Sequence, residues 1–339
     1  MQNQPARQIL KLRPEGLYCE AGDFFIDPLR AVDRAVITHG HADHARRGHR
    51  AVLATQPTID VMRVRYGASF AGSAQAMPYG NVVTIADARV SLHPAGHVLG
   101  SAQVLVEVAG QRIVVSGDYK RSPDLSNTPF EPVRCDIFIT EATFGLPVFV
   151  HPPAEHETIR LLDSMRFFEG RIHHVAAYSL GKAQRLLTLL RTQGFNEPVF
   201  VDRTTMALCE VYEHHGIRLG ALKRLEAGRL PEGALVIAPP SARDRIEGKS
   251  DQAPMTSFAS GWMNVMKRAR QGGGDLPLVI SDHADWPELT RTISEVAPAE
   301  VWITHGEEAA LLAWARGRGV EARPLSMVGY GAEDDGPEA

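Results

Sequence analysis

Apolar and polar positions between about residues 20 and 140 predict short strands separated by turns. The run RAVITH at 34–39 is rich in β-forming residues and ends in a histidine. Residues 101–118 contain an alternating stretch, a turn at 109–111 and then a continuous apolar stretch, which predicts a β-hairpin. The segment CDIFITEATFG at 135–145 predicts another strand that ends at an acidic residue.

The pattern changes after about residue 146. Apolar residues near helical spacing predict a helix over 154–170, which closes with a glycine. Residues 171–194 predict a strand, a glycine turn and an amphipathic helix, and residues 197–216 repeat the order of strand and helix. This alternation is typical of a parallel α/β unit. Residues 242–275 are polar and rich in glycine, so we expect a loop with one short helix before strands and helices resume.

Composition describes an ordinary globular protein. The chain has 339 residues, of which 44% are hydrophobic and 22% charged, and it is long for one compact domain. Its apolar runs are too short to cross a bilayer and its start lacks the plan of a secretory signal, so no membrane is expected. Three widely spaced cysteines suit the reducing cytoplasm. The net charge of −4 means that nucleic acid would need a local basic patch.

The most informative motif is THGHADH, which directly follows the first of these strands and contains His39, His41, Asp43 and His44. A strand delivers His39 to its carboxyl end, where α/β sheets usually place ligands. The spacing lets His39 and His41 reach one metal ion while Asp43 and His44 face a second. A histidine-rich surface loop is the alternative, but few such loops repeat metal ligands at this spacing.

Other predicted strands end in further candidate ligands. LHPAGHVLGSAQ offers His93 and His97, VVSGDYK ends in Asp118, and VWITHGEE ends in His305. Each histidine alone is more often an ordinary polar residue than a ligand. Together with the THGHADH motif they favour a pair of metal ions, which the Asp118 carboxylate could bridge.

Six motifs, in this order, resemble the β-CASP nuclease branch of the metallo-β-lactamase fold: THGHADH, PAGHVLGSAQ, SGDY, ITEATFG, SDHAD and THGEE. The resemblance covers nearly the whole chain. It implies an α/β fold in which residues 1–146 and 277–339 form a discontinuous αββα sandwich, with an inserted α/β β-CASP domain at 147–276. The segments AYSLGKAQRLL, SGWM and SDHADW further resemble the bacterial DNA-ligase-associated exonucleases.

The resemblance also implies a set of metal ligands. One ion would be held by His39, His41 and His97. The second would be held by Asp43, His44 and His305, and the Asp118 carboxylate would bridge the two ions. The ligand types favour Zn²⁺, and Mn²⁺ would be tolerated. The glycine before His97 and the LGSAQ after it favour His97 over His93. Asp27, in FFIDPLR, matches an aspartate that supports the histidine loop through a hydrogen bond, although an aspartate–proline turn would look the same.

Two such ions can activate water and stabilise both oxygens of an in-line attack on phosphorus. The resemblance gives His283 the role of protonating the leaving oxygen and Glu141 the role of orienting that imidazole. The catalytic set would then be Asp43, Asp118, Glu141 and His283. Ordinary polar roles at a helix start and a strand end remain the alternatives for His283 and Glu141.

Substrate contacts are suggested by two basic segments. In SLGKAQ, Ser179 and Lys182 precede a helix and suit a phosphate, although simple helix capping explains them equally well. In MKRARQGGG, Lys267, Arg268 and Arg270 could follow a nucleic-acid backbone. A solvated charged face is the alternative there, and the similar exonucleases carry a denser arginine run.

The first hypothesis is therefore a two-metal phosphodiesterase, a DNA exonuclease that acts on DNA ends in a repair pathway with a DNA ligase and a helicase as functional partners. An RNA-processing nuclease is the alternative, because His305 in THGEE resembles the RNA-cutting branches. A small-molecule metallo-hydrolase is disfavoured by the long insertion between Glu141 and His283. A non-catalytic scaffold is disfavoured because the ligands are intact.

Overall fold

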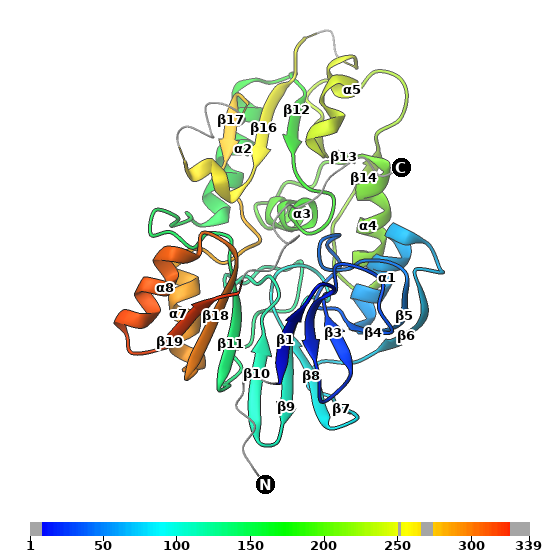
Figure 1. Cartoon of the computed structure of the whole chain (residues 1–339). Coiled ribbons are helices and arrows are strands. Elements are labelled where there is room, and N and C mark those ends of the chain that lie inside the picture. Colours follow the sequence, from blue (N-terminus) through cyan, green and yellow to red (C-terminus); the bar gives the residue numbers. More distant parts are fainter. Residues whose placement is uncertain (1–8, 250–251, 266–273, 326–339) are drawn as a thin grey trace. The chain divides into compact units, whose positions relative to one another are not determined.

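The computed structural model describes residues 9–249, 252–265 and 274–325, and the chain divides into two compact units (Figure 1). The first unit runs to Pro123, continues over Asn127–Val148 and resumes at His283. The second unit contains Asp124–Ser126 and Phe149–Asp282. The domain boundaries predicted from the sequence lie at residues 146 and 277, beside these divisions.

The first unit contains two sheets. One is formed in sequence order by β1 (Leu10–Arg13), β2 (Gly16–Cys19), β3 (Phe24–Ile26), β4 (Arg34–Val36), β5 (His49–Ala54) and β6 (Ala71–Ala76). The other has the order β19-β18-β11-β10-β9-β8-β7. Its strands are β7 (Val82–Ile85), β8 (Ala88–Pro94), β9 (Ala102–Val108), β10 (Gln111–Val115), β11 (Ile137–Ala142), β18 (Glu300–Gly306) and β19 (Glu321–Pro324). The predicted hairpin is confirmed as the antiparallel pair β9–β10.

An apolar core joins the two sheets. Phe24 and Ile26 from the first sheet belong to the same buried cluster as Val104, Ile113 and Trp302 from the second. Side chains alternate along β9, so Val104 faces this cluster while its neighbour Leu105 is buried in a different one. Both faces of the second sheet are therefore covered, which explains the nearly continuous apolar runs of its strands.

Helices cover the outer face of each sheet. The helix α1 (Gln56–Tyr66) packs Ile59 and Met62 against the first sheet. The helices α7 (Trp286–Val296) and α8 (Glu308–Gly317) bury Leu289 and Leu311 with residues of the second sheet. The first unit is thus layered helix, sheet, sheet and helix, and the prediction of a mixed α/β fold is confirmed.

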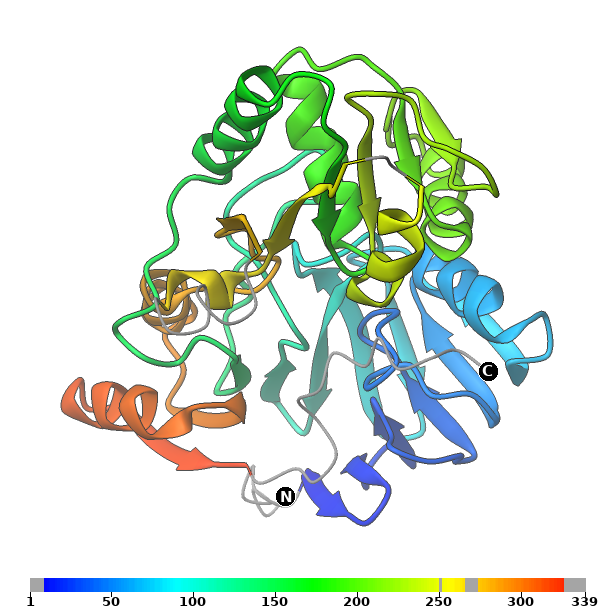
Figure 2. The same ribbon diagram turned by 90° about the horizontal axis from the view of Figure 1, so that it is seen from above.

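The second unit contains a six-stranded sheet, seen with its helices in Figure 2. All its pairings are parallel, in the order β14 (Leu222–Arg224), β13 (Val199–Val201), β15 (Leu235–Ala238), β12 (His173–Ala176), β16 (Met255–Ala259) and β17 (Leu276–Leu278). Its helices are α2 (Ala154–Phe167), α3 (Lys182–Thr192), α4 (Arg203–His214) and α5 (Arg243–Glu247), with 3₁₀ turns η2 (Pro240–Ala242) and η3 (Gly261–Asn264). The predicted parallel α/β unit is confirmed. In the described ranges, every helix is too short or too polar to cross a membrane.

Two expectations about local structure were wrong. Residues 56–66, placed in a strand-rich region, form α1, which starts where the Thr55 side chain accepts a hydrogen bond from the Thr58 amide. Residues 255–259, placed in a loop, form β16, which pairs with β12 on one side and β17 on the other. Packing on the first sheet decides the structure of α1, and pairing within the second unit's sheet decides that of β16. In both cases these contacts override a weak local pattern in the sequence.

Thr55 links α1 to the loop that carries His97, because its hydroxyl also lies 2.7 Å from the Gly100 carbonyl oxygen, to which it donates. We expect Thr55→Val, which keeps the shape but removes both bonds, to lower the free energy of unfolding by about 1–2 kcal/mol. Urea unfolding measures the change. The matched control is Thr290→Val, whose hydroxyl bonds only within its own helix. Equal losses in the two variants would contradict the cap and its link to Gly100.

Candidate metal centre

The second sheet brings several strand ends to one edge. The strands β10, β11 and β18 run parallel, and β8 has the same direction because β9 is antiparallel to both of its neighbours. Their carboxyl ends therefore meet at one edge, which is where His97, Asp118, Glu141 and His305 lie. The Ala102 amide at the start of β9 donates to the Thr38 carbonyl, at 2.8 Å. This bond attaches the THGHADH loop to the same edge.

The THGHADH loop turns back on itself just after β4. The strand ends at Val36, so His39 lies three residues beyond it rather than at its end. The amides of His44 and Ala45 both donate to the His41 carbonyl, at 3.2 and 2.7 Å. This turn brings the His44 ring to 4.2 Å from the His39 ring, measured between centroids.

The first group of candidate ligands is formed by three histidines and a carboxylate. The Nε2 atoms of His39 and His97 lie 3.1 and 3.0 Å from Nδ1 of His41. Asp118 Oδ2 lies 3.6 Å from His39 Nε2 and 3.9 Å from His97 Nε2. All four residues are buried, and one atom from each lies within 4.8 Å of the others.

The second group is formed by Asp43, His44 and His305. His44 Nε2 lies 3.6 Å from Asp43 Oδ2, and the rings of His44 and His305 stack with centroids 5.2 Å apart. The same His44 nitrogen lies 3.5 Å from Asp118 Oδ2. That oxygen is therefore close to nitrogens of both groups, which is the position that a bridging ligand needs.

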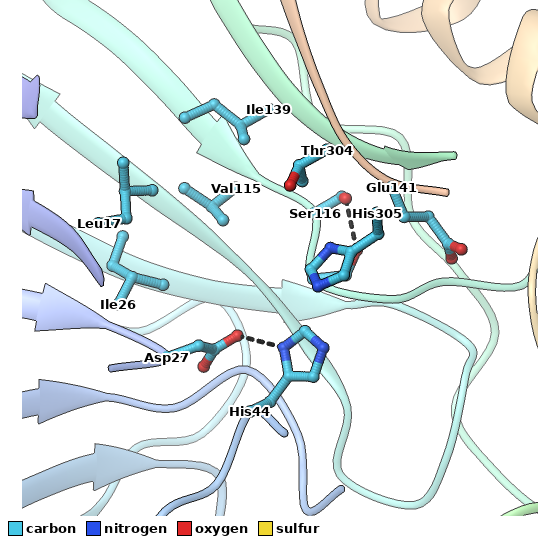
Figure 3. A pocket seen from close by; sticks show the side chains of 11 residues that line it. Leu17, Ile26, Asp27, His44, Val115, Ser116, Ile139, Glu141, Thr304 and His305 are labelled. Atoms are coloured by element: carbon cyan, nitrogen blue, oxygen red, sulfur yellow. Dashed lines mark hydrogen bonds and ion pairs between the residues drawn. The ribbon is translucent and has the colours of Figure 1, made fainter. Parts of the chain in front are cut away.

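Asp27, at the end of β3, sets the orientation of the histidine loop (Figure 3). Its carboxylate accepts hydrogen bonds from the Thr38 amide at 2.8 Å, the Thr38 hydroxyl at 2.6 Å and His44 Nδ1 at 2.8 Å. Since the Thr38 hydroxyl donates to Asp27, it accepts from His39 Nδ1, 3.0 Å away. Both histidines thus carry their proton on Nδ1 and direct the Nε2 lone pair into the site, as metal ligation requires.

The electrostatics of the buried groups suit cations. Burial lowers the pKa of His39 and brings the pKa of His305 to about 4, so both imidazoles are neutral near pH 7. Burial also opposes the charged form of His44, but Asp43 and Asp118 outweigh it and raise the pKa of that imidazole. Burial opposes ionisation of Asp118, but His44 outweighs it and lowers the pKa of that carboxyl. The neutral imidazoles of His39 and His305 and the ionised carboxylate of Asp118 are donors that fit divalent metal ions, and a bound ion would replace the proton that His44 otherwise holds on Nε2.

A small cavity of about 20 Å³ lies behind the second group, with room for about one water molecule (Figure 3). Apolar side chains close one side of it: Leu17, Ile26, Val115 and Ile139. Polar residues line the other side: Asp27, His44, Ser116, Glu141, Thr304 and His305. The ligands are thus backed by the core between the sheets.

Glu141 and His283 form a hydrogen-bonded pair beside the first group. Glu141 Oε2 lies 3.0 Å from His283 Nδ1, and Oε1 accepts a bond from the Tyr119 amide at 2.7 Å. Burial raises the pKa of Glu141 although His283 opposes this. His283 Nδ1 is 4.0 Å from Asp118 Oδ2, so these three residues could also surround an ion. The short contact with Glu141 instead engages Nδ1 and leaves Nε2 for proton transfer.

Other predicted residues lie elsewhere. His93 is half-buried, with Nε2 3.1 Å from the Ser91 hydroxyl, and it belongs to none of the three groups. In the second unit the Lys182 ammonium is buried, 3.2 Å from Asp282 Oδ1, and Ser179 is also buried. Lys182 therefore already has an ionic partner instead of facing solvent. Lys267, Arg268 and Arg270 lie outside the described residues.

Sequence reasoning missed Thr38 and Tyr119. Thr38 fixes the tautomer of His39, and the Tyr119 amide binds Glu141. Thr38 has a usable signal, because a hydroxyl directly before the first ligand of the loop can accept from its imidazole. Tyr119 acts through its backbone, which leaves no signal in residue type.

Comparisons with known proteins give the family. No family model matches the chain. The chain is 30% identical over 315 residues to a probable DNA ligase of Opitutus terrae, which covers 91% of the chain and 30% of that protein. It is 32% identical over 238 residues to the endoribonuclease YSH1 of Mycosarcoma maydis, which covers 54% of the chain and 26% of that protein. It is 34% identical over 113 residues to cleavage and polyadenylation specificity factor subunit 3 of Dictyostelium discoideum, which covers 30% of the chain and 13% of that protein.

The chain belongs to the β-CASP family of metallo-β-lactamase nucleases. The resemblance drawn from its motifs is thereby confirmed at the level of the family. This β-CASP chain spans less than a third of the length of each of these three relatives. A crystal structure of a protein of unknown function from Enterococcus faecalis V583 has the same fold, with a TM-score of 0.58, 13% identity, and coverage of 87% of this chain and 79% of that chain. The family implies divalent metal ions, which the two groups of ligands fit.

Asp27 offers a test of the site that leaves the ligands in place. We expect Asp27→Asn to weaken metal binding about 10–100-fold, because the amide cannot accept from Thr38 and His44 as the carboxylate does. Asparagine tolerates the positive φ of 44° at this position, so the backbone should be retained. Chelator competition followed by elemental analysis measures the affinity. Asp33→Asn, at an exposed aspartate, is the control, and wild-type affinity in both variants would contradict the role of Asp27.

Proposed function

We propose that the first unit is a metallo-β-lactamase αββα domain, that the second is an inserted β-CASP domain, and that the protein is a two-metal phosphodiesterase. The observation that carries the proposal is the place of Asp118 Oδ2, within 4 Å of nitrogens from both ligand groups. His39, His41 and His97 would hold one ion. Asp43, His44 and His305 would hold the other, with Asp118 between them. The ligand types favour Zn²⁺ and tolerate Mn²⁺.

Held by these residues, two divalent ions would supply an activated water and would stabilise the charge that develops on the phosphoryl oxygens. The protein positions the proton transfer. The Glu141 carboxylate accepts a hydrogen bond from the Nδ1–H group of His283, which fixes the ring and directs Nε2 away from the carboxylate. His283 then donates a proton from Nε2 to the leaving oxygen, and the buried Glu141 stabilises the imidazolium before this step.

We further propose that the substrate is DNA and that the enzyme removes nucleotides from DNA ends during repair. Support comes from the relative named as a probable DNA ligase, which matches 91% of this chain, against 54% for the endoribonuclease YSH1. A ligase and a helicase would be its functional partners. Substrate contacts by Ser179, Lys182, Lys267, Arg268 and Arg270 and a location in the cytoplasm remain predictions.

An RNA-processing ribonuclease is the second candidate. It is supported by the relatives named as endoribonucleases and by His305, whose imidazole lies in the second ligand group. The two candidate functions share the metal centre and differ only in whether the substrate is DNA or RNA.

Matched strands distinguish the two candidates. With Mn²⁺ or Zn²⁺ we expect the protein to degrade end-labelled single-stranded DNA faster than RNA of the same sequence, and to leave circular single-stranded DNA intact. Asp118→Ala should lower the rate by about 1,000-fold or more, because the bridging ligand is lost. His93→Ala, outside the ligand groups, should keep the wild-type rate. Faster loss of RNA would favour the second candidate, and no cleavage of either strand would overturn the phosphodiesterase.

The role of His283 can be tested with two leaving groups. On DNA we expect His283→Ala to lower kcat about 100–10,000-fold while two metal ions stay bound, since general acid catalysis is lost. On a 4-nitrophenyl phosphodiester, whose leaving group needs no proton, the loss should be much smaller. Quench-flow rates and elemental analysis give both values. Equal losses on the two substrates, or loss of metal, would show that His283 does not act as the acid.

A further inference from the structure

The segment that follows Asp118 contacts the residues around His283 through its backbone. The Tyr119 carbonyl accepts a hydrogen bond of 2.7 Å from the Ala284 amide, directly after His283. The Tyr119 amide donates to Glu141 on its other side. One residue thus links the Asp118 ligand to both members of the Glu141–His283 pair.

The next residue adds an ionic contact. The Lys120 ammonium lies 2.8 Å from Glu288 Oε2, and the two side chains are only 7% and 14% exposed. Glu288 lies in the first turn of α7, where its Oε2 accepts from the Asp285 amide at 3.3 Å and its own amide donates to Asp285 Oδ1 at 3.1 Å. The N-cap of this capping box is Asp285, two residues after His283, and the helix begins at Trp286.

The Glu288 carboxyl of this ion pair is held in its charged form. Burial opposes ionisation of Glu288, but Lys120 and the Ser122 hydroxyl outweigh it and lower the pKa of the carboxyl. Buried ion pairs contribute little net stability, because the cost of removing two charges from water offsets their attraction. Their better-attested role is to select one arrangement of the chain, and no step proposed above uses Lys120 or Glu288.

We propose that Lys120 and Glu288 are positioning residues: their ion pair holds the start of α7 against the Asp118 segment and so keeps the His283 imidazole in place beside Glu141. The inference rests on the proposed function only in that His283 donates the proton. Lys120 is two residues from Asp118 and Glu288 five residues from His283. The hydrogen bond between Tyr119 and Ala284 joins the same two segments as the ion pair. If the ion pair is lost, the backbone that carries His283 is therefore held less firmly.

The same two elements carry a second ion pair that serves as a matched control. Arg121 Nη2 lies 2.7 Å from Glu295 Oε2, so it joins the same segment to the same helix about two turns further from His283. Arg121 is 8% exposed and Glu295 35%. If ion pairs only fasten α7 to the sheet, both pairs should behave alike.

The experiment compares Lys120→Met, Glu288→Gln and the double variant with Arg121→Met and Glu295→Gln, each as the full metal-loaded chain. Glutamine can keep the capping bonds of residue 288 while removing the charge. We expect the first three to lower kcat on single-stranded DNA about 10–100-fold, with KM changed less than about threefold and two ions bound. The double variant should lose no more than the worse single variant. The controls should stay within about twofold of wild type.

A second readout does not need activity. In protein with ¹⁵N-labelled histidine, the His283 Nδ1–H resonance, identified by its absence in His283→Ala, should shift or broaden in Lys120→Met and Glu288→Gln but not in the Arg121 and Glu295 variants. An unchanged resonance, loss of metal or equal effects in both pairs would overturn the positioning role. If wild-type protein cleaves no nucleic acid, the proposed function fails, while the resonance still decides whether the ion pair positions His283.

Discussion

The carboxylate of Asp118 is the group on which the rest of the first unit depends. It is buried among imidazoles from separate segments, and an ionised carboxylate in that position needs positive charge around it. The parallel strands β10, β11 and β18 deliver Asp118, Glu141 and His305 to one sheet edge, and the loop after β4 brings His39 and His44 from the other sheet. The two-sheet core therefore serves to hold ligands of opposite sheets at contact distance.

The candidate ligands could be selected from the sequence because each carries its own signal, and the structure brings them together in two groups. His39, His41, Asp43 and His44 lie in one short motif, and the remaining ligands each follow an apolar strand. What ties them together could be predicted only in part. The resemblance implied that Asp27 supports the loop, but the tautomer of His39 depends on a hydrogen bond to the Thr38 hydroxyl, and that of His44 on a bond to Asp27 that only the turn of the loop establishes.

Interactions between distant parts of the chain also explain what the sequence did not predict. The ionic contact of Lys182 with Asp282 joins residues that are far apart in the sequence but both in the second unit. Helix α1 was missed because its buried stripe is short and begins with a threonine, and β16 because it mixes polar and apolar residues in a central strand. Each element is decided by what packs against it rather than by its own composition.

The spread of the ligands along the chain has a consequence for folding. His44 and His305 stack in the same group, yet they lie on either side of the whole second unit in the sequence. An ion held by both would act as a crosslink that closes a very long loop, and it would restrict the unfolded chain far more than a local contact does. The metal would therefore stabilise the fold by linking the two sequence segments of the first unit, in addition to its role in catalysis.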